Sequence, residues 1–142
     1  MMSLELHHCK ERIADTAGEL SDVISRMISL LRFENADVYT LCRECFTDDY
    51  MQFRSITSGD FHKLWLDSCQ HISADAESKR LLALVGETLG TSDTQSQIER
   101  LKVICNDMQD HTKSLKRKVA EQKKLYTTLG ALSGLAVSIM II

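Results

Sequence analysis

Apolar residues recur at intervals of three and four along the first thirty residues, which is the spacing of one face of an α-helix. The series consists of Leu6, Cys9, Ile13, Ala17, Leu20, Ile24, Met27 and Leu31. The positions between them carry mostly polar residues, including Glu11, Asp15, Glu19 and Asp22. The pattern predicts one long amphipathic helix over residues 4–33, with its charged face in water.

Capping residues divide the middle of the chain into three shorter predicted helices. Asp37 and Ser73 are the expected N-caps of the first and third helices, and Ser58-Gly59-Asp60 is expected to open the second after an irregular segment. Gly90 suits the left-handed backbone that ends the third. The apolar faces consist of Leu41, Cys42, Cys45 and Phe46; of Phe61, Leu64, Trp65 and Cys69; and of Leu81, Leu82, Leu84, Val85 and Leu89. The large Trp65 side chain is expected in the core.

The last helix is predicted to begin at a capping box, with Ser92 as N-cap and Gln95 three residues later. The three-and-four pattern then resumes with Ile98, Leu101, Cys105, Met108, Leu115 and Val119. No helix-breaking residue interrupts it before the apolar end of the chain. We therefore expect one rod of about 50 residues, or about 75 Å.

Composition agrees with an all-α protein. The chain has 142 residues, no proline and only six glycines, whereas all-β chains usually need many turns built from those two residues. Together with the helices predicted from the apolar pattern, these numbers indicate a single helical bundle of about five to six helices with one appendage. The five cysteines are an odd number, and no apolar signal stretch begins the chain, which favours a reducing, cytoplasmic environment for the bundle.

The appendage is the C-terminal segment 125–142, which contains no charged residue. As a helix it would be about 27 Å long, against about 30 Å for the hydrocarbon core of a bilayer. We predict a C-terminal transmembrane helix, with residues 1–124 as the cytoplasmic domain. Within the span, Gly130 and Gly134 form a small-xxx-small face on which another membrane helix can pack. The alternative is a soluble, self-associating helical regulator whose apolar tail is buried in a dimer core.

Charge is distributed unevenly. Residues 113–124 hold six Lys or Arg and one Glu, which leaves 11 − 19 = −8 for the rest of the chain. This basic stem precedes the predicted span, and no aromatic residues alternate with its charges as they would in a nucleic-acid site. We expect the stem to face anionic lipid through Lys116, Arg117, Lys118, Lys123 and Lys124.

Motifs that carry chemistry are missing from the sequence. It has no glycine-rich phosphate loop and no nucleophile motif beside its scattered histidines, so neither an enzyme nor a small-molecule or cofactor site is predicted. Cys42 and Cys45 have the spacing of half a zinc site, and His7 and His8 could supply the other half. Because a second properly spaced pair is absent, the two thiols are predicted to pack in the core.

Several features together resemble one family. Trp65, the run Gly86-Glu87-Thr88-Leu89-Gly90 with Asp93 and Ser96-Gln97 after it, and Leu129-Gly130 with Gly134-Leu135 are similar to stage III sporulation protein AB. The resemblance implies a helical body similar to the cytoplasmic domains of secretion and pilus platform proteins, in the mother-cell membrane facing the forespore. It also implies a non-catalytic adaptor that joins a secretion-type ATPase, stage III sporulation protein AA, to other stage III sporulation channel proteins.

The resemblance also assigns roles to residues. Glu87, Asp93 and Gln97 are carried over as candidate partner-binding residues, and Gly130 and Gly134 as the membrane-packing face. Members of the family usually begin with a transmembrane helix, whereas residues 1–12 here contain several charges. We expect either that the tail is the sole anchor or that the true start lies upstream.

Overall fold

The computed structural model describes residues 2–90 and 93–141, and it describes side chains for residues 9–90 and 93–124. Within these residues the fold is all-helical, without strands, as predicted. The elements are α1 (Met2–Phe33), α2 (Val38–Cys45), the 3-10 helix η1 (Asp48–Tyr50), α3 (Met51–Arg54), α4 (Phe61–Gln70), α5 (Ala76–Thr88) and α6 (Thr94–Ile141).

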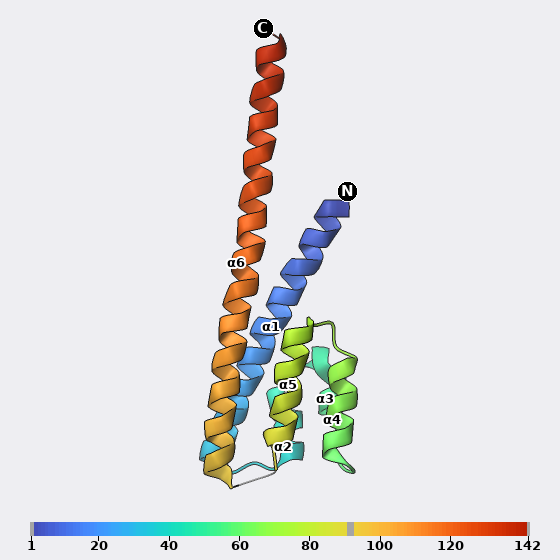
Figure 1. Cartoon of the computed structure of the whole chain (residues 1–142). Helices are drawn as coiled ribbons and strands as arrows, with labels where there is room; N and C mark the ends of the chain where they lie inside the picture. Colours follow the sequence, from blue (N-terminus) through green and yellow to red (C-terminus); the bar gives the residue numbers. More distant parts are fainter. Residues whose placement is uncertain (1, 91–92, 142) are drawn as a thin grey trace.

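Two long helices, α1 and α6, run antiparallel and make the most extensive contact in the molecule. The short helices α2 to α5 lie on one side of this pair, as Figure 1 shows. There α5 packs against α6 and α4, while α2 packs against α1. The first and last helices therefore form a frame, and the segment between them supplies the rest of the core.

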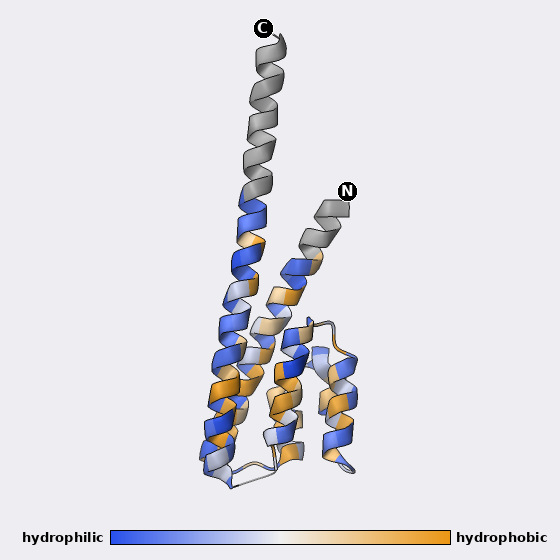
Figure 2. Cartoon of the chain, in the orientation of Figure 1, coloured by the Kyte–Doolittle hydropathy of each residue, from blue (hydrophilic) through white to orange (hydrophobic). Residues whose placement is uncertain are grey.

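The α1 prediction is confirmed, because the helix spans Met2–Phe33 and its apolar series is buried from Ala17 to Leu31. Cys9 is an exception, since its side chain is exposed. The reason is the divergence of α1 from α6 toward the N-terminus, which leaves that end of α1 without a helix to cover it (Figure 1). Figure 2 shows hydrophobic residues gathered where the helices of the bundle face one another.

The centre of the core is aromatic. Phe46 stacks on Phe53 with ring centroids 4.4 Å apart, and Phe53 meets Trp65 edge-on at 4.9 Å. Trp65 is fully buried, as predicted. The segment expected to be irregular instead forms η1 and α3, because one helical turn carries both Tyr50 and Phe53 into this cluster.

Helix starts test the capping predictions individually. Asp37 caps α2 by accepting a hydrogen bond from the Thr40 amide at 2.8 Å, and Asp60 begins α4 as predicted. The Ser73 prediction is wrong, because α5 begins after Asp75. Leu64 was also expected on the buried face of α4 but is 37% exposed, because the neighbouring helices cover α4 on one side only.

Helix α6 is a single continuous helix of 48 residues, which confirms the predicted rod. It extends well beyond the bundle, at the same end of the molecule as the start of α1 (Figure 1). Ile98, Leu101, Cys105 and Met108 are buried, whereas Leu115 and Val119 are half-buried because α1 has begun to diverge there.

Candidate functional site

The turn between α5 and α6 brings the three predicted partner-binding residues to one end of the bundle. This end lies opposite the end from which α6 projects (Figure 1). The turn begins where the Leu89 amide donates to the Val85 carbonyl at 3.0 Å and Gly90 adopts a φ of 78°. A left-handed backbone of this kind favours glycine, which explains why α5 ends at Thr88, shortly before Gly90.

Gln97 holds this turn together from inside. Its Oε1 accepts a hydrogen bond from the Gly90 amide at 3.2 Å, and its side chain is buried. The Gln97 side-chain oxygen therefore satisfies the backbone N–H of Gly90, which lies just after the end of α5. This hydrogen bond gives Gln97 a structural role. The fold does not test the prediction that Gln97 also contacts a partner.

Asp93 caps α6. Its carboxylate accepts hydrogen bonds from the Ser96 amide at 3.2 Å and from the Ser96 hydroxyl at 2.7 Å. Both bonds hold the pKa of Asp93 below its ordinary value, and the bond from the Ser96 hydroxyl has the larger effect. Ser92, the predicted N-cap, lies outside the described residues, and Asp93 fills the capping role. The side chain is nevertheless exposed.

Glu87 is exposed near the end of α5 and lines a groove between α5 and α6. We call this the junction groove; its other lining residues are Leu84, Thr88, Arg100, Val103 and Ile104, and its volume is about 610 Å³. Val103 is 61% exposed, so an apolar side chain of α6 is accessible at this groove. The junction groove therefore offers a protein partner an apolar floor between one carboxylate and one guanidinium group.

Sequence reasoning missed a second cluster, which ties α5 to the middle of α6. The Asp75 carboxylate accepts from the Ser78 hydroxyl and faces His111 Nε2, each at 2.5 Å. Partial burial alone would raise the pKa of Asp75, but the hydrogen bonds from Ser78 and His111 lower it overall. The only local signal was the spacing of Asp75 and Ser78, because His111 lies 36 residues away.

This cluster lacks the connectivity of a hydrolytic triad. Ser78 is fully buried and bonds to Asp75 rather than to His111, so the histidine is not placed to remove its proton. The arrangement is a partly buried polar link between the start of α5 and α6, in which each group has a partner.

Cys42 and Cys45 are fully buried on α2, as predicted. Burial raises the pKa of each thiol to about 12, so both remain protonated at neutral pH. Among the described residues, no group of three or more His, Cys, Asp or Glu is arranged to hold a metal ion.

The residues predicted to face lipid lie on the part of α6 beyond the α5 contact. Lys116, Arg117, Lys118, Lys123 and Lys124 are all exposed, and Figure 2 shows this part of α6 as predominantly hydrophilic. Among the residues that the structure describes, no helix is both long and apolar enough to cross a bilayer. The side chains of the predicted span 125–142, including the positions of Gly130 and Gly134, lie outside the described ones.

Comparison with known proteins gives one match. The sequence model of the family described as stage III sporulation protein AB matches residues 6–142. No curated protein and no solved structure matches the chain. The likeness of the body to secretion and pilus platform domains therefore stays a prediction.

Proposed function

Because the chain belongs to the stage III sporulation protein AB family, we propose that it is a non-catalytic, membrane-anchored adaptor of the channel complex between mother cell and forespore. In this role it connects a cytoplasmic secretion-type ATPase, stage III sporulation protein AA, to the membrane components of that complex. Membership of this family suggests a mother-cell context. The proposal adds its anchor, its orientation and its partners.

The continuity of α6 is the observation that carries the proposal. One unbroken helix runs from the α5–α6 turn to Ile141. From Thr94 to the start of the uncharged tail at Leu125 it rises about 46 Å. A helix of this length sets a fixed spacing between a partner bound at the turn and the segment that enters the membrane.

The charge of the chain supports the anchor. The uncharged segment 125–142 follows directly after a basic stem whose described lysines and arginine are exposed. A basic segment of this kind stays on the cytoplasmic side of the membrane and contacts anionic lipid. Gly130 and Gly134 then provide a face for another membrane helix within the span.

The position of the junction groove supports it as the surface for the ATPase. The groove lies at the end of the bundle remote from the tail, where a large cytoplasmic partner meets no bilayer. Glu87 contacts the partner directly, while Asp93 and Gln97 fix the α5–α6 turn beside it. Excluding residues 113–124, the chain has a net charge of −8, which favours association with a basic surface and makes the association sensitive to salt.

The test uses the full chain with an N-terminal tag in sporulating cells. Membranes are washed with carbonate, proteins are crosslinked, and partners are identified by mass spectrometry. Glu87→Lys is expected to reduce crosslinks to the ATPase at least tenfold while the protein stays in the membrane. Glu44→Lys is the matched control, because it makes the same change of charge at an exposed residue of α2 that does not line the groove. In the unmodified chain Glu44 pairs only with its exposed neighbour Arg43 among the described residues.

Two outcomes would contradict the proposal. If the chain is removed by carbonate and crosslinks mainly to itself, the soluble, self-associating alternative takes its place. If Glu87→Lys and Glu44→Lys reduce the crosslinks equally, the junction groove is not the surface that binds the ATPase.

A further inference from the structure

A second groove lies between α1 and α6, near the level at which the two helices separate (Figure 1). Its volume is about 430 Å³, and we call it the fork groove. Ile13 from α1 and Leu115 and Val119 from α6 form its floor, and each of these side chains is half-buried. Asp75, immediately before α5, closes one side. Three separate elements thus enclose an apolar surface that nothing in the described structure covers.

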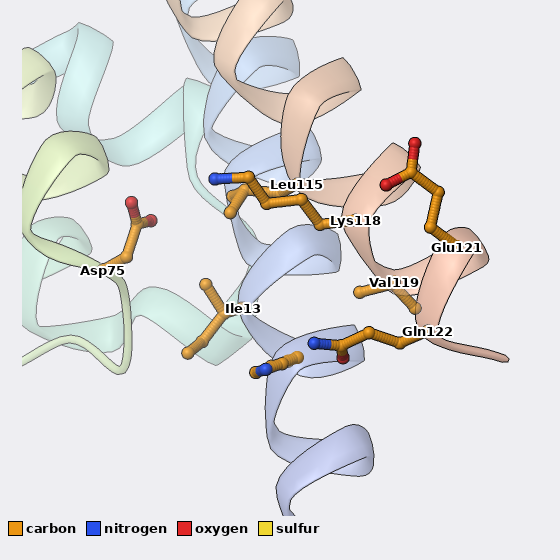
Figure 3. Close-up of a pocket in the computed structure, with 8 residues that line it drawn as sticks. Ile13, Asp75, Leu115, Lys118, Val119, Glu121 and Gln122 are labelled. Atoms are coloured by element: carbon orange, nitrogen blue, oxygen red, sulfur yellow. The ribbon is translucent and has the colours of Figure 1, made fainter. Parts of the chain in front are cut away.

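The fork groove is lined by two lysines and two acidic residues, Asp75 and Glu121. Lys10 from α1 and Lys118 from α6 both line it, and neither makes an ion pair in the described part of the chain. Figure 3 shows the Lys118 side chain extending across the opening toward Asp75, whereas Glu121 points away from the apolar floor. The Asp75 carboxylate already bonds to Ser78 and His111. The two lysines that line the groove therefore have no ion-pair partner among the described residues, while Asp75 is already bonded to other groups.

We propose that the fork groove binds an amphipathic helix of a protein partner, with Leu or similar residues along one face and Glu or Asp on its flanks. The apolar face packs on Ile13, Leu115 and Val119, and the acidic flanks pair with Lys10 and Lys118. Binding of a helix in an apolar groove is a common mode of peptide recognition, and the charges at the rim select the partner.

Position along α6 favours a protein helix over a lipid as the occupant. If the membrane core begins at Leu125, Val119 and Leu115 lie about 9 and 15 Å outside it along the helix axis. An acyl chain would have to leave the hydrocarbon core to reach them, whereas a helix of a partner at the membrane surface lies at this level. This step rests on the proposed function, since it needs the tail to be anchored in the membrane. The existence of the groove and its charges does not depend on that anchor.

The proposal is tested with the full chain in nanodiscs of neutral lipid, and again in detergent micelles. The probes are two fluorescent 18-residue helical peptides with the same leucine stripe, one flanked by Glu and the other by Lys. Anisotropy is expected to show binding of the Glu peptide and at least tenfold weaker binding of the Lys peptide. Val119→Ser is expected to weaken binding of the Glu peptide by about tenfold.

A charge reversal separates recognition from misfolding. The double variant Lys10→Glu, Lys118→Glu is expected to prefer the Lys peptide, which a merely unfolded protein would not do. Lys63→Glu on the exposed side of α4 is the matched control and should bind like the unmodified chain.

Three results would overturn the proposal. The first is equal binding of both peptides, or of neither, by the unmodified chain. The second is phosphatidylglycerol that copurifies with the chain and is lost in Val119→Ser, because lipid would then be the occupant. The third is an oligomer that dissociates when Val119 is changed, because a second copy would then fill the groove. Carbonate extraction measures the anchor separately, so loss of the anchor and failure of the groove are distinguishable.

Discussion

The indole ring of Trp65 lies directly against the backbone of Gly86, in the space that a side chain at residue 86 would occupy. A Cβ atom placed on Gly86 would overlap Cδ1, Nε1 and Cγ of the ring. The ring is fixed there by a hydrogen bond from Nε1 to the Leu82 carbonyl at 2.8 Å. This glycine, near the C-terminal end of α5, therefore sets how closely α4 and α5 approach each other.

Gly86→Ala is expected to destabilise the protein by about 3 kcal/mol, because the indole is held on all sides and cannot move away from the new methyl group. Urea unfolding followed by circular dichroism measures the effect. Gly18→Ala is the control, since its Cβ would meet Thr112 at an ordinary 3.5 Å. This second change should leave stability unchanged or raise it by about 0.5–1 kcal/mol. Equal losses for the two variants would contradict the role assigned to Gly86.

Asp93 has two separable roles, the helix cap and the predicted partner contact. Asp93→Ser keeps an oxygen that can cap α6 and removes the charge, so the melting temperature should change little. Asp93→Ala removes both and should lower the melting temperature. If Asp93 also contacts the ATPase through its charge, both variants will lose crosslinks to it. Normal crosslinking by Asp93→Ser would restrict the residue to capping.

Asp75 makes the stability of the protein depend on pH. Its folded pKa lies below the ordinary value. The contribution of its charge is therefore complete above the unfolded pKa of about 3.9 and is lost as pH falls through the folded pKa. Asp75→Asn should lower stability by about 1 kcal/mol at pH 7, and the difference from the unmodified chain should shrink below about pH 4. Unfolding curves at pH 7, 5 and 3 measure this. A difference that is constant over this range would show that the charge of Asp75 does not stabilise the fold.

The cysteines should differ sharply in reactivity. Cys9 is exposed, whereas Cys42, Cys45, Cys69 and Cys105 are buried, and burial raises the pKa of Cys42 to about 12. At pH 8 an aromatic disulfide reagent should modify Cys9 rapidly and the other four only after unfolding. Cys9→Ser is the control and should abolish the rapid phase. Rapid reaction of two or more thiols in the native protein would mean that the part of the core holding the second thiol opens readily.

The sequence predicted the elements whose causes are local. The α1 helix follows from a regular apolar spacing, and the Asp37 cap follows from one carboxylate placed three residues before the amide that it binds. At Ser73, prediction from local residues fails. Asp75 begins α5 in its place, and the Asp75 carboxylate bonds to His111, which no local pattern connects to it.

The candidate sites differ in the same way. Glu87, Asp93 and Gln97 are grouped by the family resemblance of the motif that holds them, although only the structure shows that Gln97 is buried against Gly90. The fork groove could not be anticipated, because Ile13 and Val119 belong to opposite ends of the chain. Spacing along one helix places residues on a face but does not determine which other helix covers that face.

By itself the sequence determined that the chain is helical, that its last helix is one rod, and that charge and apolarity are concentrated toward the end of that rod. These properties depend on residues near one another in the chain, through backbone hydrogen bonding and side-chain periodicity. Only the tertiary structure decided that α1 lies antiparallel to α6 and diverges from it, which leaves the apolar side chains of the fork groove uncovered. The packing of helices depends on the shapes of side chains that meet across the core. Which side chains meet cannot be read from their spacing along the sequence.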